Sequence, residues 1–183
     1  ENRTPKPGEA VVIDGQEVQR LNFADITLGS SAQGQEIWLQ TDPADQADKL
    51  VFQGALTLNS LLGSNRFQGL IEGRGMTIRG AGQTTYLDGA DIWHDQAVLI
   101  HDSLQVNHDS IIEVADSDAS TDLSLTIEGN ITVAAGQTLE LLADELVFRR
   151  YTDDQDVTIT LGEGATLVLG ASAIDFGEGV SLV

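Results

Sequence analysis

An all-β fold made of stacked repeats is the fold class that the sequence predicts, on three observations. Residues 131–148 align without a gap on residues 159–176, at an offset of 28, with eight identical positions. Within each copy, apolar and polar residues alternate in runs of three to five residues, the pattern of a strand with one buried face. Between the runs stand Gly, Ala, Asn and Asp, which favour turns over helices. Since one such unit cannot bury a core alone, its copies are expected to stack.

A fainter copy of the repeat precedes these two. The segment that starts at Leu104 overlays the segment that starts at Ile131, at an offset of 27, and leaves every apolar position apolar. The same alignment pairs Glu113 with Glu140.

Three more starts are placed further upstream. Residues 76–93 are interpreted as the next copy, which starts at Met76, and two others start at Ile26 and Leu56. The spacings between successive starts are then 30, 20, 28, 27 and 28. The repeats are therefore expected to share one shape and to differ in the length of their loops.

Each unit is interpreted as one coil of a parallel β-helix, or β-solenoid, with coils of about 20–30 residues. Stacking would place Ile131 against Ile159 and Leu139 against Leu167, which forms a hydrophobic ladder. The side chains expected to point inward are Val133, Leu139, Leu141, Leu161, Leu167 and Leu169.

The first part of the chain is expected to join a polar arm to short strands. Residues 1–9 hold two of the three prolines and are interpreted as a linker or extended arm, and residues 10–183 as a single β-solenoid domain. Short strands are expected at residues 10–13, 18–23 and 26–28, before a polar loop at residues 42–49.

The rest of the chain alternates between apolar ladders and turns. Residues 50–62 carry an apolar ladder, residues 63–82 are rich in glycine, with turns expected at residues 69–82, and residues 121–127 alternate as a strand does. Residues 177–183 (GEGVSLV) offer no polar cap, which a solenoid end needs. The expected partners are therefore a second copy, by end-to-end self-association, or flanking domains of a longer polypeptide of which this chain is a section.

The composition argues against several classes of function. With 29 acidic and 9 basic residues the formal net charge is −20, and such a surface repels phosphate backbones and anionic membranes, so no nucleic-acid binding is expected. No run reaches the roughly 20 apolar residues that cross a bilayer, so no membrane insertion is expected. The absence of cysteine excludes disulfides and thiolate metal sites. An acidic surface of this kind suits a secreted protein.

Several motifs recur in stretches such as LTIEGNITVAAGQTLELLADELVF (residues 125–148): I/L-T-V/L, a glycine, T-L-x-L and a closing apolar-x-Phe. In these motifs residues 50–183 resemble the repetitive β-helix shafts of very large secreted bacterial adhesins, of the filamentous-haemagglutinin-like kind. The resemblance implies a right-handed parallel β-helix, a secreted or cell-surface location, and a role in adhesion or as a stalk. It supplies no catalytic residues, so no enzyme activity is expected from it.

An acidic loop offers a candidate metal site. Asp116, Asp118, Ser120 and Asp122 place oxygen atoms at positions one, three, five and seven, as a calcium loop does. The glycine at position six and the glutamate at position twelve of such loops are missing. The metal ligands that the pattern suggests are Asp116, Asp118 and Asp122, with calcium as the ion. The alternative interpretation is a solvated acidic loop.

All three histidines precede an aspartate, at His94, His101 and His108. An imidazole beside a carboxylate can be a metal ligand with a supporting partner, or a general base. Neighbours on a strand, however, point to opposite faces, and residues seven apart lie around one coil, so these pairs need not converge. The other interpretation is that they are polar turn residues.

A second class of function is a carbohydrate-active β-helix protein that binds or degrades polysaccharides, as a lyase or hydrolase. Such a site needs acidic residues together on one outward face, with aromatic side chains beside them. The group available for it is Asp91, Trp93, His94 and Arg79. Few exposed aromatics are expected, and this favours the structural and adhesive class, with a carbohydrate or other cell-surface ligand as its possible partner.

Overall fold

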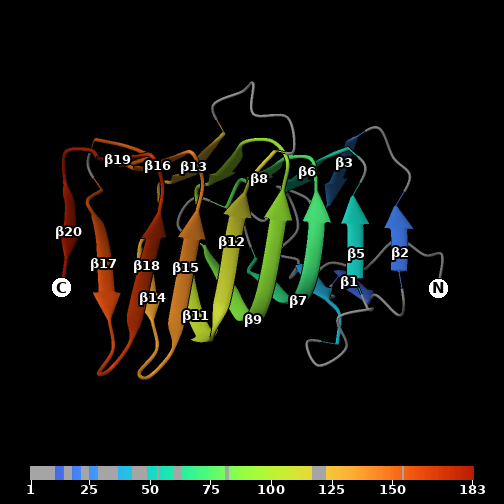
Figure 1. Cartoon of the computed structure of the whole chain (residues 1–183), viewed down its shortest axis with the longest axis horizontal. Coiled ribbons are helices and arrows are strands. Elements are labelled where there is room, and N and C mark those ends of the chain that lie inside the picture. Colours follow the sequence, from blue (N-terminus) through green and yellow to red (C-terminus); the bar gives the residue numbers. More distant parts are fainter. Residues whose placement is uncertain are drawn as a thin grey trace.

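The computed structural model describes residues 11–14, 18–21, 25–28, 37–42, 49–52, 54–59, 63–80, 83–116, 123–153 and 155–183, with side chains from residue 37 onward. Within these ranges it has twenty strands and no helix. The strands form a 13-stranded sheet and a seven-stranded sheet, in both of which neighbouring strands run parallel (Figure 1). The prediction of an all-β fold is confirmed.

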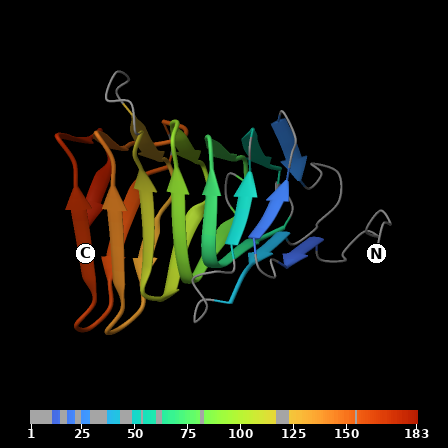
Figure 2. The ribbon, with the colours of Figure 1, turned by 45° about the vertical axis from the view of Figure 1, so that its right-hand side comes forward.

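The larger sheet contains two rows of strands that share β7 (Asn65–Gly73) and β9 (Thr84–His94). The first row also contains β1 (Val11–Asp14), β4 (Ile37–Gln40), β11 (Ser103–His108), β14 (Ile131–Val133), β17 (Val157–Leu161) and β20 (Val180–Leu182). The second row also contains β2 (Val18–Leu21), β5 (Lys49–Phe52), β12 (Ser110–Val114), β15 (Thr138–Leu142) and β18 (Thr166–Gly170). The sheet curls between the two rows (Figure 2).

The smaller sheet takes one strand from each repeat. Its strands are β3 (Asp25–Leu28), β6 (Ala55–Leu58), β8 (Met76–Ile78), β10 (Val98–Ile100), β13 (Ser124–Ile127), β16 (Glu145–Phe148) and β19 (Ala173–Phe176). Successive strands of both sheets follow one another along the longest axis of the molecule, from β1, β2 and β3 at one end to β19 and β20 at the other (Figures 1 and 2).

The register of the last repeats agrees with the alignment of the sequence. Ile131 lies opposite Ile159, and Leu139 lies opposite Leu167, both at an offset of 28. Leu104 lies opposite Ile131, at the expected offset of 27. Identical residues of the last two repeats therefore stack on one another in neighbouring strands.

The expected pairing of Glu113 with Glu140 is wrong. Glu113 lies opposite Leu142, and Glu140 lies opposite Ile111, at an offset of 29. The offset grows because only Asp109 separates β11 from β12, whereas four residues separate β14 from β15. An alignment without gaps could not show this difference in the length of the corner between the two rows.

The upstream start at Met76 was also misplaced. Met76 belongs to the smaller sheet, where it pairs with Leu56 and Val98, and not to the first row, which contains Ile131. The spacings of 30 between Ile26 and Leu56 and of 20 between Leu56 and Met76 are real strand pairings. The spacing of 28 between Met76 and Leu104 joins strands of different sheets and is not a repeat.

Residues 69–82, where turns were expected, contain the second half of β7 and all of β8. β7 is nine residues long, with alternating buried and half-buried positions. Three of its inward positions are Asn65, Gly69 and Gly73, which hid the apolar alternation. A side chain at Gly69 would overlap the hydroxyl of Thr41, and Gly69 has a φ of 72°, so the position suits glycine alone.

The core lies between the sheets and is built from the apolar residues that point inward from the strands. Val133, Leu139 and Leu141 are fully buried. The other three residues expected inside, Leu161, Leu167 and Leu169, are partly buried and pack against this core. The closing aromatic residues of the last two repeats, Phe148 and Phe176, stack with ring centroids 5.0 Å apart and ring planes 10° apart.

Candidate functional site

The suggested calcium loop falls mostly outside the described residues. Asp116 is described and half-buried at the end of the segment that follows β12, whereas Asp118 and Asp122 lie in the undescribed range 117–122. Among the described residues, no group of three or more His, Asp or Glu side chains is arranged to hold a metal ion. The calcium site therefore stays a prediction.

The three His-Asp pairs have three different surroundings. His94 points inward at the end of β9 and is fully buried, whereas His101 follows β10 and is half-buried. His108 is exposed at the end of β11. The structure therefore does not bring these three rings together into one site.

His94 occupies space that a glycine leaves in the neighbouring strand. It lies opposite Gly73 on one side and Val114 on the other, and a side chain at Gly73 would come within 2.8 Å of the imidazole ring. Both ring nitrogens lack a hydrogen-bond partner. Burial lowers the pKa of His94 to about 4, so the ring is neutral near pH 7.

A second buried group is Asp102, which is also fully buried. Its Oδ2 accepts hydrogen bonds from Asn65 Nδ2 at 3.0 Å and from Thr85 Oγ1 at 2.9 Å. Its Oδ1 faces the backbone of Gly80 without a well-formed hydrogen bond. Burial raises the pKa of Asp102 to about 6, although the hydrogen bonds from Thr85 and Asn65 act in the opposite direction. Asp102 is thus a core residue in a polar cluster.

His101 belongs to a cluster at the corner that follows the smaller sheet. Its Nδ1 contacts Oε2 of Glu128, and Arg149 Nε donates to Oε1 of Glu128 at 2.8 Å. The ring of Tyr151 packs edge-on against His101, with centroids 4.6 Å apart. Since both carboxylate oxygens of the buried Glu128 have partners within the cluster, the cluster is closed by its own contacts and is not an open site.

A hollow of about 240 Å³ opens on the outer face of the second row, where β9, β12 and β15 meet. Asp91 and Glu140 lie on either side of Ile111 in the same register. Burial, followed by the charge of Glu72, raises the pKa of Asp91. The residues that line the hollow are Gly89, Ala90, Asp91, Asp109, Ser110, Ile111, Thr138 and Glu140, and we call it the acidic groove.

The enzyme group expected from the sequence does not assemble. Asp91 and Trp93 share the outer face of β9, but His94 points into the core between its neighbours. Arg79 follows β8 in the smaller sheet and is exposed there. Alternation along β9 explains the failure, because adjacent residues of a strand point to opposite faces. The acidic groove contributes Glu140 instead, which the sequence did not single out.

Two aromatic rings, with a guanidinium group between them, lie on the outer face of the first row. Trp38, Arg66 and Tyr86 follow one another across β4, β7 and β9, and we call these three residues the aromatic ladder. The guanidinium carbon of Arg66 lies 5.7 Å from the ring centre of Trp38 and 5.1 Å from that of Tyr86. Each of the three side chains is flanked along its strand by buried neighbours, so all three point outward.

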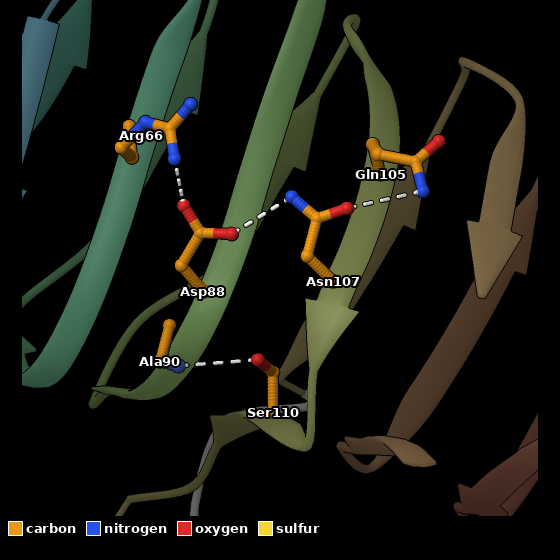
Figure 3. A network of polar contacts seen from close by, with 6 residues as sticks. All are labelled: Arg66, Asp88, Ala90, Gln105, Asn107 and Ser110. Atoms are coloured by element: carbon orange, nitrogen blue, oxygen red, sulfur yellow. Dashed lines mark hydrogen bonds and ion pairs between the residues drawn. The ribbon is translucent and has the colours of Figure 1, made fainter. Parts of the chain in front are cut away.

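Polar contacts hold Arg66 of the aromatic ladder in place (Figure 3). Arg66 forms an ion pair with Oδ2 of Asp88, and Asn107 Nδ2 donates to Oδ1 of Asp88 at 2.8 Å. Gln105 Nε2 donates to Oδ1 of Asn107 at 3.4 Å. Sequence reasoning missed this set, because its members come from successive repeats of unequal length.

Comparisons with known proteins assign no family to the chain. No family model, curated protein or solved structure matches it. In the described part of the chain, no helix has the length and apolar character needed to cross a membrane.

Proposed function

We propose that the chain is a right-handed parallel β-solenoid whose repeats are coils of about 20–30 residues, a period typical of such arrays. We propose further that it is a structural and adhesive segment of a secreted or cell-surface bacterial protein or filament. The acidic surface and the resemblance of the repeat motifs to adhesin shafts support the location. Calcium bound at Asp116, Asp118 and Asp122 belongs to the same proposal, as a stabiliser of the loop.

One observation carries the proposal, namely the unbroken ladder of the first row. The residues that each lie opposite the next along this row are Val11, Ile37, Asn65, Thr85, Leu104, Ile131 and Ile159. The second row and the smaller sheet advance by one strand per repeat in the same way. The right-handed sense rests on the strong preference of connections between parallel strands for that hand.

The end of the molecule at β18, β19 and β20 presents an apolar surface. Phe176 and Leu182 are 52% and 68% exposed, and they border a hollow of about 340 Å³ together with Leu167 and Leu169. Among the described strands, β18, β19 and β20 pair on one side only, and so do β1, β2 and β3 at the opposite end. Open parallel edges over an apolar cross-section pair with other edges.

The occupant that we propose for this end surface is the β1, β2 and β3 edge of a second copy. Such a head-to-tail contact is heterologous and generates a filament, since it leaves both ends open after each addition. Flanking domains of the same polypeptide are the competing occupant.

The test is the concentration dependence of molecular mass by light scattering, with electron microscopy of the products. The wild-type chain is expected to form rods that lengthen with concentration, and Leu182→Asp to stop this growth. Val168→Asp, on the outer face of the same layer, is the matched control and is expected to leave growth intact. A monomer at all concentrations would contradict self-association and favour flanking domains of the same polypeptide as the occupant.

The acidic groove supports a second candidate function, a hydrolase that acts on polysaccharides. Asp91 and Glu140 are two strand spacings apart, so their Cα atoms are about 9–10 Å apart. Inverting glycosidases hold an acid and a base at carboxyl separations of roughly 6.5–9.5 Å. Asp91, whose pKa is raised, is suited to the role of acid.

Reducing-end release from neutral and acidic polysaccharides tests this candidate. Asp91→Asn and Glu140→Gln are each expected to abolish turnover, and Glu163→Gln, at an exposed turn, is expected to retain it. Absence of turnover in the wild-type chain would remove the hydrolase from consideration.

A further inference from the structure

The outward aromatic side chains of the larger sheet are confined to one part of the molecule. Trp38, Tyr86 and Trp93 lie on β4 and β9. The positions that continue the aromatic ladder along the first row are Gln105, Thr132 and Thr160, which carry no ring. The aromatic ladder is therefore a local feature and not a product of the repeat.

The chemistry of this surface matches that of a sugar chain. The apolar faces of sugar rings pack on aromatic rings, and their hydroxyl groups need both donors and acceptors at the edges. Trp38 and Tyr86 are two strand spacings apart, about 9–10 Å, so they offer two stacking positions on one line across the strands. Asp88, Asn107 and Gln105 offer carboxylate and amide groups beside that line.

The surface is already ordered before any ligand arrives. Asp88 fixes the guanidinium of Arg66, and Asp88 and Gln105 fix Asn107 (Figure 3). The rings of Trp38 and Tyr86 pack against the same guanidinium. Side chains that are held in advance lose less conformational entropy on binding, which raises affinity.

Charge decides between neutral and anionic ligands. The charge of Arg66 is balanced by Asp88, so the aromatic ladder together with Asp88 carries no net charge. With a net charge of −20 on the whole chain, a polyanion would be repelled. Addition of a peptide as an extra strand is disfavoured as well, because that mode uses the edge of a sheet and this surface is a face.

We infer that the outer face of β4, β7, β9 and β11 binds a neutral polysaccharide laid across the strands, with its rings on Trp38 and Tyr86. This inference rests on the proposed adhesive role and names the class of ligand and the surface that would serve it. The binding surface shares no residue with the end surface or with the lining of the acidic groove.

The test is affinity electrophoresis of the full 183-residue chain in native gels that contain hydroxyethylcellulose, xylan or galactomannan, with pectin as the anionic probe. At least one neutral polymer is expected to retard the wild-type chain. Trp38→Ala and Tyr86→Ala are each expected to weaken that binding roughly three- to tenfold. Tyr151→Ala, which removes an exposed ring elsewhere, and Thr160→Ala, further along the same row, are expected to bind as the wild type does.

Circular dichroism and melting temperature show whether each variant is folded, and a folded variant with lost retardation supports the inference. The inference is overturned if no neutral polymer retards the wild type, if pectin alone does, or if Tyr151→Ala weakens binding as much as Tyr86→Ala. Glu163→Gln, at an exposed turn away from this face, must leave retardation unchanged. Rod growth is measured with end-surface variants that do not touch the aromatic ladder, so failure of this inference is distinguishable from failure of the proposed filament.

Discussion

Two inward positions carry titratable side chains, and glycines in the neighbouring strands and turns make room for them. His94 lies against Gly73, while Asp102 lies between Gly80 and Gly129, where an added side chain would overlap its carboxylate or its backbone. Burial of each group carries a desolvation cost, which at Asp102 is partly offset by the hydrogen bonds from Asn65 and Thr85. The core gives up free energy at both positions.

The pH dependence of stability should reveal Asp102. Its folded-state pKa of about 6 is above the ordinary value of 3.8, so its contribution to stability is fully present below pH 3.8 and is lost as pH rises through 6. Asp102→Asn keeps the neutral form at every pH. The difference in free energy of unfolding between this variant and the wild type is expected to increase in favour of the variant from pH 4 to pH 7, by about 3 kcal/mol at most.

Urea unfolding at pH 4, 5, 6 and 7 measures this difference. His94 acts in the opposite direction, since its folded-state pKa of about 4 is below 6.5, and its contribution is present above pH 6.5 and lost as pH falls through 4. The comparison of the variant with the wild type cancels the histidine, which both chains share. A difference that does not change with pH would show that Asp102 does not titrate in this range.

The alternation of faces predicts a sharp contrast between neighbouring residues. Val133 is fully buried, and Val133→Asp is expected to lower the free energy of unfolding by about 3–5 kcal/mol, because it buries an unpaired charge. Thr132 points outward, and Thr132→Asp is expected to change it by about 0.5 kcal/mol or less. Melting temperatures of the two variants check the assignment, and equal values would mean that the faces are wrongly assigned.

Among the elements, β7 and β9 show best why part of the fold could be predicted and part could not. The last repeats were predicted because their inward positions, such as Leu139 and Leu167, are apolar without a break. In β7 and β9 the inward positions include Asn65, Gly73 and His94, so the apolar period disappears although the strands remain. Side chains from adjacent repeats fill these gaps, and such compensation is not readable within one repeat.

The candidate sites were harder to predict for a related reason. Asp91 and Trp93 were recognised as acidic and aromatic neighbours, but Glu140 joins Asp91 only after the corner between β11 and β12 is known to be short. The aromatic ladder depends on two pairings, Trp38 with Arg66 and Arg66 with Tyr86, whose offsets along the chain differ. Unequal loops leave the sequence without a fixed spacing from which to infer the contact.

The strand register itself can be tested with an engineered disulfide, since the chain has no cysteine. Thr132 and Thr160 lie opposite each other in neighbouring parallel strands, about 4.8 Å apart, which is within the range that a disulfide spans. The Thr132→Cys/Thr160→Cys pair is expected to close under mild oxidation. The Thr132→Cys/Thr158→Cys pair, displaced by two residues to roughly 8 Å, is expected to stay reduced.

Free-thiol counts after oxidation distinguish the two pairs. Closure of the displaced pair in preference to the aligned one would mean that β14 and β17 are paired in a different register. The same measurement is independent of any assumption about function.

The loop that contains Asp116, Asp118 and Asp122 has its own test. Bound calcium is expected to raise the melting temperature by mass action, and a chelator to reverse the rise. Because a strongly acidic chain responds to any divalent ion by screening, the comparison must be between variants. Asp118→Asn is expected to lose most of the response, while Asp153→Asn, in another acidic turn, keeps it. An undiminished response in Asp118→Asn would exclude this loop.

For the whole molecule, the most important feature is how far along the array the pairings of each strand extend. Each strand of the described ladders pairs with strands of the adjacent repeats and with none beyond them. Stability in such an array is a sum over neighbours, and opening at one end does not require opening at the other.

Because strands pair only with adjacent repeats, the repeats can unfold in sequence from one end. Backbone amides of β20 and β18 are expected to exchange with deuterium fastest, and those of β11 and β14, with a neighbour on each side, slowest. A step-like profile along the chain, measured by mass spectrometry of peptides, would indicate unzipping inward one repeat at a time. Uniform protection across all repeats would indicate instead that the array melts as one cooperative unit. A molecule that unzips from the β20 end keeps the face formed by β4, β7, β9 and β11 folded.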